Sequence, residues 1–313
     1  MHTVNLPIGA VAFFAIFFML KKNPPQFTDL TIRQQLARLD LLGEFFLLPC
    51  IVCLLLGLQW GGSTYAWSDG RIIALFTLFA AFFVAFVLVQ IFMQKTATLP
   101  ASVVGNRNII AAMWLTFCIA SAMLTLTYFI PTWLQAIKGQ SAVKSGIDTI
   151  PMVLSLVVAN ITAGQLTGRI GYYTPAAYLS AIIMPIGAGL VTTWDVNTSS
   201  PKWIGYQILL GFGIGCGMQQ GTMTAQTVLS KKDAAIGVSL VMFCQQMGGA
   251  IFISVGQNVF DTKLVEGLTN LVKGLSAEMI VNTGATDLRG IVPAAQLPEV
   301  LVAYNLALRQ VVS

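Results

Sequence analysis

Uncharged amide side chains lie inside apolar stretches of this sequence, where a hydrocarbon environment would leave them short of partners. The stretch from Ile204 to Val228 contains one adjacent glutamine pair, and the stretch from Ile236 to Gly256 contains another. In a membrane, such an amide needs a neighbouring helix or a water-filled cavity, so its chemistry is hydrogen bonding to either. The candidates for lining a substrate cavity are Gln219, Gln220, Gln245, Gln246, Asn160 and Tyr128.

Residue counting predicts that two of these amides share one depth. Gln219 lies ten residues before Leu229, and Gln245 lies nine residues after Ile236. At about 1.5 Å per residue, both are about 15 Å from the helix ends, near the middle of a core about 30 Å thick. Interhelical hydrogen bonding that only holds the bundle together is the alternative for any single glutamine. For the set we favour a cavity.

Glycine recurs at every second position of the first of these stretches, from 211 to 217. A glycine face lets another helix backbone approach closely, and the small-xxx-small spacing here occurs on two faces. Close helix packing explains the glycines by themselves, whereas glycines beside buried amides point to transport. The residues expected to pack helices are Gly211, Gly213, Gly215, Gly217, Gly221, Gly248 and Gly249.

The elements that must position these residues are membrane spans. Of 313 residues, 56% are hydrophobic and 9% charged, against roughly 25% charged in soluble domains, and the mean hydropathy is +0.78. A spanning helix needs about 20 mainly apolar residues. We therefore predict an all-α polytopic membrane protein with eight spans: Asn5 to Leu20, Leu41 to Gln59, Ile72 to Met93, Asn108 to Pro131, Ile147 to Leu166, Pro175 to Thr193, Trp203 to Leu229 and Ile236 to Gly256. We expect Gln257 to Ala303 to be too polar to span.

The net charge of +5 predicts an orientation through its distribution along the chain. Basic residues concentrate after the odd-numbered spans, for example at Lys21, Lys22 and Arg169. The positive-inside tendency then makes these loops cytoplasmic, with the first helix running inward. Asn197 opens an Asn-Thr-Ser sequon in a loop on the opposite side and is a candidate glycosylation site. We expect the lipid bilayer as a partner, and no nucleic acid.

Residues for enzyme chemistry, cofactors and metals are sparse. The five cysteines fall within predicted spans, and the Cys50-x-x-Cys53 pair has apolar surroundings that do not suit redox or zinc chemistry. His2 is the one histidine, so no catalytic constellation is evident. We expect no cofactor, no metal and no enzyme activity. Of the acids in the spans, Asp148 is expected to cap the helix that follows it.

Several motifs together carry a family resemblance over nearly the whole chain. They include NLPIGA at Asn5, LQWGG at Leu58, SAVKSGI at Ser141, TGRIGYYTP at Thr167 and MFCQQMGGAIFISVGQNVF at Met242. The sequence resembles the fungal 14-spanner drug:proton antiporters of the major facilitator superfamily. The resemblance implies a partial superfamily fold: residues 1–20 as a remnant of the N-terminal half, 21–40 as a cytosolic linker, 41–93 as an inserted helix pair, 94–256 as the C-terminal half, and 257–313 as an extracellular loop with the start of a missing last helix.

One loop departs from the family's pattern. Its signature G-x-L-x-D-R-x-G is matched at Gly164, Arg169 and Gly171, while Gly168 stands at the acidic position. Without that acid, we expect Arg169 to cap a helix end or meet a lipid phosphate.

By resemblance, the complete protein exports small amphipathic organic compounds, such as fungal metabolites, toxins and drugs, in exchange for protons. The resemblance leaves the first five helices of the family unmatched, so we expect this chain to be inactive alone. The alternatives are a truncated product, a gene with wrongly drawn boundaries, and a siderophore or other solute transporter. The expected location is the plasma membrane, with a vacuolar or vesicle membrane as the alternative.

Overall fold

The computed structural model describes residues 5–19, 40–93, 98–271, 292–293 and 296–312. The chain divides into two compact units, Met1–Leu41 and Leu42–Ser313. The first unit contributes α1 (Asn5–Met19), a 15-residue apolar helix in which Phe13 stacks on Phe17, and Phe14 on Phe18, one turn apart. The second unit contains the remaining helices, and the described residues of both units include no β-strand.

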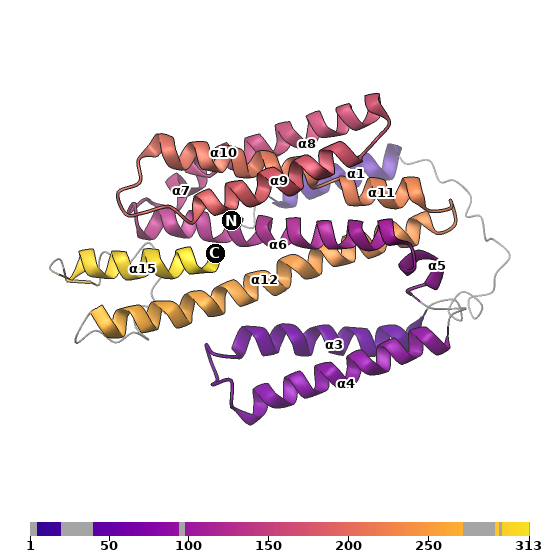
Figure 1. Ribbon diagram of the computed structural model, residues 1–313, viewed down its shortest axis with the longest axis horizontal. Coiled ribbons are helices and arrows are strands. Elements are labelled where there is room, and N and C mark those ends of the chain that lie inside the picture. The colour runs from indigo at the N-terminus through magenta and orange to yellow at the C-terminus, as the bar shows by residue number, and fades with distance from the viewer. Residues whose placement is uncertain (1–4, 20–39, 94–97, 272–291, 294–295, 313) are drawn as a thin grey trace. The chain divides into compact units, whose positions relative to one another are not determined.

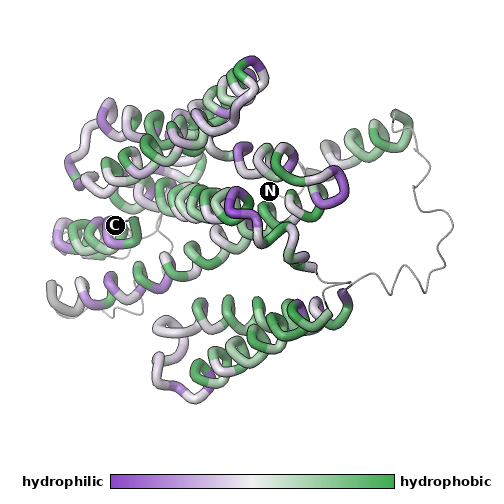
Figure 2. The backbone as a smooth tube through the Cα atoms, turned by 45° about the vertical axis from the view of Figure 1, so that its right-hand side comes forward, coloured by the Kyte–Doolittle hydropathy of each residue, from purple (hydrophilic) through white to green (hydrophobic). Residues whose placement is uncertain are grey.

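The second unit is a bundle of long apolar helices (Figure 1). Six helical segments in the described residues are long and apolar enough to cross a membrane, which confirms a polytopic all-α fold. Hydrophobic residues run along the helices and hydrophilic ones gather at their ends (Figure 2). The helices are α3 (Leu41–Trp60), α4 (Gly70–Phe92), α5 (Ala101–Val104), α6 (Arg107–Ala136), α7 (Ala142–Asp148), α8 (Ile150–Ile170), α9 (Thr174–Val191), α10 (Ser200–Gly217), α11 (Gln220–Val228), α12 (Ala234–Leu271) and α15 (Leu297–Val312).

Three of the eight expected spans differ from the structure. The first, Asn5 to Leu20, is α1, whose 15 residues are too few for a membrane span. The stretch from Trp203 to Leu229 forms α10 and α11, separated at Met218 and Gln219, instead of one helix. The last expected span does not end at Gly256, because α12 continues to Leu271. Its extension is more polar but keeps apolar residues such as Leu264 and Leu268 on a buried face. The beginning of the stretch from Gln257 to Ala303, which was expected to be too polar to span, is thus part of α12 as far as Leu271, and residues 272–291 lie outside the described residues.

Helix ends follow local sequence signals. Asp69 caps α4 by accepting a hydrogen bond from the Arg71 amide, and Asn106 caps α6 in the same way. Gly171 ends α8 at φ 78°, a left-handed conformation that glycine adopts without strain. The expected cap at Asp148 was wrong: Asp148 is the last residue of α7, and Thr149 takes the N-cap position of α8.

The long helices pack against particular neighbours. The close contacts join α10 to α8 and α9, and α12 to α6 and α15. Figure 1 shows α6, α9 and α12 running in one direction and α8, α10 and α15 in the other. The buried core cluster that contains Trp133, Trp194 and Phe260 also takes in residues of α6, α9, α10, α12 and α15. The hairpin of α3 and α4 is held by its own contacts, including the Phe46 and Phe82 rings.

Candidate functional site

The glycines of α10 lie against the backbones of two neighbouring helices. A Cβ on Gly211 or Gly215 would collide with backbone atoms of Met152 or Leu156 on α8. On the opposite face, a Cβ on Gly213 would lie 2.5 Å from the Met184 amide nitrogen of α9. Gly217 faces Ser180 on α9 and Ile119 on α6. The alternation of glycines therefore serves two helix contacts at once.

Three further glycines lie where α11 and α12 meet α6. A Cβ on Gly221 would meet Thr116 and Val241, one on Gly248 would meet the Phe117 carbonyl, and one on Gly249 would meet Leu124. These contacts bring the glutamine-bearing helices onto α6. The seven glycines named from the sequence thus all lie at helix contacts.

The interruption between α10 and α11 places Gln219 outside both helices. Gln219 is the N-cap residue of α11, with φ −96° and ψ −11°, and its side chain is exposed. Asn160 of α8 is half-buried and its Nδ2 lies 3.9 Å from the Met218 sulfur, at the interruption. Asn160 and the interruption therefore lie together.

The remaining candidates have different surroundings. Gln220 is 1% exposed, and its Nε2 donates to the Cys216 carbonyl at 3.1 Å. Gln245 is half-buried on α12, whereas Gln246 is exposed. Tyr128 of α6 is 50% exposed, with its ring edge-on to Phe129. The cavity lining proposed for these side chains stays a prediction.

A buried amide that the sequence analysis did not single out lies in the middle of α10. Gln207 is 0% exposed, and neither its Oε1 nor its Nε2 has a hydrogen-bond partner among the described residues. A buried amide without a partner destabilises the fold. The signal was available, because Gln207 lies one turn before the glycines in the same apolar stretch.

The loop residues named from the sequence lie at helix ends. Arg169 is exposed in the last turn of α8, where a cation complements the partial negative charge of the helix terminus. A Cβ on Gly164 or Gly171 would meet no atom within 4 Å. Asn197 is exposed in the loop between α9 and α10.

The loop between α9 and α10 is held by side chains from two other parts of the chain. Lys138 Nζ donates to the carbonyls of Val196 and Thr198, each at 2.8 Å. From α15, Asn305 donates to the Trp194 carbonyl at 3.2 Å, and Arg309 donates to the Thr192 carbonyl. Every second carbonyl of this loop therefore accepts a side-chain hydrogen bond. We call these three donors and their loop the carbonyl clamp.

Burial changes the proton affinity of the lysine in the carbonyl clamp. Partial burial lowers the pKa of Lys138 from its usual value, and the negative charge of Asp195 opposes that shift. The Lys138 ammonium also lies 5.3 Å from the centre of the Trp133 ring. These contacts stabilise a charge in a place where water is partly excluded.

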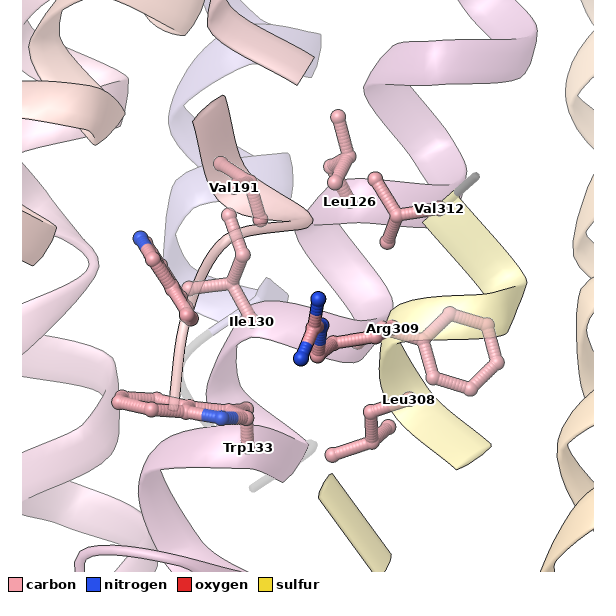
Figure 3. Close-up of a pocket in the computed structure, with 9 residues that line it drawn as sticks. Leu126, Ile130, Trp133, Val191, Leu308, Arg309 and Val312 are labelled. Carbon is pink, nitrogen blue, oxygen red and sulfur yellow. The ribbon is translucent and has the colours of Figure 1, made fainter. Parts of the chain in front are cut away.

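Two cavities adjoin α6 and α15. The smaller lies beside the carbonyl clamp, with Arg309 extending from α15 into the space between Trp133 and Leu308 (Figure 3). The space in it that a water-sized molecule can occupy is about 20 Å³. The larger, of about 340 Å³, is an apolar groove lined by Trp114, Phe117, Cys118, Ser121, Ala122, Thr125, Leu126, Ala188, Phe252, Val311 and Val312. None of the six sequence-named cavity candidates lines either one.

Comparison with known proteins identifies the chain's relatives. No protein-family model matches the chain. It is 48% identical over 307 residues to the MFS-type efflux pump MFS1 of Trichophyton rubrum, a match that covers 97% of this chain and 57% of that protein. It is 43% identical to the efflux pump aflT of Aspergillus parasiticus, covering 98% of this chain and 60% of that pump. It is 42% identical to the MFS thioclapurine efflux transporter tcpA of Claviceps purpurea, covering 98% of this chain and 57% of that transporter.

These relatives confirm the resemblance drawn from the motifs. They are named as efflux pumps and transporters, and none of the three is named as an enzyme. The chain spans about half the length of the curated relatives it matches. By its sequence and its bundle of apolar helices, this chain belongs with the fungal MFS-type efflux pumps and transporters.

Proposed function

We propose that this chain forms part of an exporter that moves small amphipathic organic compounds across a membrane in exchange for protons. The observation that carries the proposal is the identity of 42% to 48% with proteins named as efflux pumps or transporters, over at least 96% of this chain. Secondary transporters of this kind commonly work by rocking one bundle of helices against another around a site near the membrane midplane.

The helices that bear amides are suited to one wall of such a site. Gln219 lies where α10 gives way to α11, and discontinuous helices supply backbone and side-chain groups in many transporters. Asn160 lies at the same interruption. We infer that Gln219, Asn160 and the half-buried Gln245 contact substrate, with the opposite wall supplied by helices beyond those of this chain.

Complementation tests the export function. A pump-deficient yeast receives this chain, the part of the Trichophyton rubrum pump that the chain does not cover, or both together. We expect efflux of an amphipathic fluorescent dye from cells that contain both parts, and we expect a protonophore to abolish it. Efflux by this chain alone would contradict the shared-cavity proposal. Efflux that persists with the protonophore would contradict proton exchange.

Dye efflux can also test the proposed wall residues. Gln219→Leu and Asn160→Leu should each lower the efflux rate of the two-part transporter. Arg169→Gln is a matched control, because Arg169 is exposed at the end of α8. Equal efflux by all three variants would remove the amides from the substrate site.

We propose the plasma membrane as the location and an external loop for Asn197. Glycosidase treatment of the chain expressed in yeast should increase its gel mobility, and Asn197→Gln should abolish that change. A mobility change that persists in Asn197→Gln would move the modification elsewhere. A change absent from the parent chain would contradict glycosylation at Asn197.

A further inference from the structure

The loop between α3 and α4 contacts α12 near the far end of that helix. Gly62 in this loop has φ 81°, and a Cβ added to it would lie 2.7 Å from Oδ1 and 3.1 Å from Nδ2 of Asn258. Both the left-handed backbone and the close approach favour glycine at this position. Gly62 and the Asn258 amide are therefore in direct contact.

Hydrogen bonds and a ring contact fix the shape of this loop. The Gly62 amide donates to the Tyr65 carbonyl at 2.8 Å, and the Tyr65 amide donates to the Trp60 carbonyl at 3.0 Å. The Trp67 ring stacks on Phe76 of α4, with 6.3 Å between ring centres. Because the loop is tied to both of its helices, a displacement of Gly62 moves the whole hairpin.

The Asn258 amide is covered at a level where α12 has left the hydrocarbon. Its side chain is 9% exposed, and its Nδ2 has no hydrogen-bond partner among the described residues. Asn258 lies 24 residues after Ala234, the first residue of α12, so it is about 36 Å along the helix and beyond a hydrocarbon core about 30 Å thick. The orientation expected from the basic residues has α3 and α12 both running outward, so the contact lies on the outer side.

We propose that Asn258 attaches the α3–α4 loop to the outer end of α12, so that the hairpin and α12 move as one body. The helices that pack on α12 are α6, α11 and α15, so the contact joins the hairpin to the main bundle. If the chain exports solutes as proposed above, the hairpin moves with the wall that this chain supplies, and the opposite wall moves against both. The attachment itself does not depend on that function.

Cross-linking of the purified chain tests the attachment. Ser63→Cys, next to Gly62 in the loop, is combined with Asn258→Cys, and a short bis-methanethiosulfonate reagent joins the two thiols. Ser63→Cys with Ser239→Cys is the matched control, because Ser239 is exposed on the same helix but about 28 Å from Asn258. We expect the joined peptides, followed by mass spectrometry, to form about tenfold faster or more in the first pair.

Thermal midpoints give a second measurement of the same contact. Gly62→Ala adds a methyl group against Asn258 and should lower the midpoint by about 3 °C or more. In the Asn258→Ala background the methyl group no longer meets an amide, so the same substitution should lower the midpoint less. Gly70→Ala is the control, because its new Cβ has no atom within 4 Å, and it should leave the midpoint nearly unchanged.

The two-part transporter tests whether the attached parts move together. A cross-link between Ser63→Cys and Asn258→Cys should leave dye efflux unchanged, with the treated parent chain as the blank for its native cysteines. Cross-linking no faster than in the control pair, equal losses from Gly62→Ala in the two backgrounds, or loss of efflux on cross-linking would each overturn the proposal. Absence of efflux before any cross-link contradicts the export function alone, and the measurements on the purified chain then decide the attachment.

Discussion

The indole Nε1 of Trp133 donates a hydrogen bond of 2.7 Å to Oδ1 of Asn305, a residue 172 positions further along the chain. The same amide donates through Nδ2 to the Trp194 carbonyl at 3.2 Å. Both Trp133 and Asn305 are buried, and the Trp133 and Trp194 rings lie 4.7 Å apart. One side chain of α15 thus joins α6 to the loop between α9 and α10.

Asn305→Leu should destabilise the chain. It leaves the buried Trp133 N–H and the Trp194 carbonyl without this partner, at a cost of about 1–3 kcal/mol. The measurement is the thermal midpoint of the purified chain in detergent. Leu306→Ala, at the exposed next residue, should change stability by less than about 0.5 kcal/mol.

A double-mutant cycle isolates the hydrogen bond from the loss of packing. Trp133→Phe should cost less in the Asn305→Leu background than in the parent chain, because the orphaned N–H is then removed together with its partner. Equal costs in the two backgrounds would show that the contact contributes nothing of its own.

Gly213→Ala should destabilise the contact between α10 and α9. The added methyl group would lie 2.5 Å from the Met184 nitrogen and 2.7 Å from its Cα, so one backbone must move, at a cost of about 1–3 kcal/mol. Gly205→Ala on the same helix has no atom within 4 Å of the new Cβ. We expect Gly205→Ala to be neutral or to stabilise the chain by up to about 1 kcal/mol. Thermal midpoints that fall equally for both would contradict the close contact.

The helices and their close contacts were predictable from the sequence to different degrees. Apolar length alone predicted α3, α4, α6 and α9, because a membrane span leaves a long run of hydrophobic residues. The glycine spacing from 211 to 217 predicted close contacts on two faces, but it did not identify the partners. No proline marks the interruption at Met218 and Gln219, which explains why a single span was expected there.

Contacts between distant residues had no signal in local spacing. Asn305 lies in residues 257–313, which were expected to be a loop with the start of a last helix, and its partners are more than 100 residues away. The last part of α12 was missed because the span was expected to end at Gly256, although the helix continues to Leu271. Polar residues near the end of a long helix interrupt the hydropathy pattern without interrupting the helix.

The lowered pKa of Lys138 predicts that the stability of the chain depends on pH in the alkaline range. Burial lowers its pKa in the folded chain below the usual value of 10.5. Between the lowered pKa and 10.5, the unfolded chain binds more protons than the folded chain, so this residue's contribution to stability rises with pH and falls as pH is lowered. The thermal midpoint of the parent chain, minus that of Lys138→Met, should therefore rise as pH approaches 10.5.

Lys144→Met is the control for loss of one positive charge, since Lys144 is exposed on α7. Its difference from the parent chain should lack the rise assigned to Lys138. A flat difference for Lys138→Met would show that the Lys138 ammonium is as well stabilised in the carbonyl clamp as in water.

Gln207→Met should stabilise the chain, which is an unusual outcome for a buried position. Gln207 is fully buried, and neither of its amide atoms has a partner among the described residues. Methionine has a similar length and volume without a strong hydrogen-bonding group, so the desolvation cost of the amide, about 1–3 kcal/mol, should be recovered as a higher thermal midpoint. Gln246→Met, at an exposed position of α12, should change the midpoint little by comparison. A lower midpoint for Gln207→Met would instead show that a water molecule is hydrogen-bonded to this amide. Replacing an amide by an apolar side chain of the same size lowers stability only where the amide has hydrogen-bond partners.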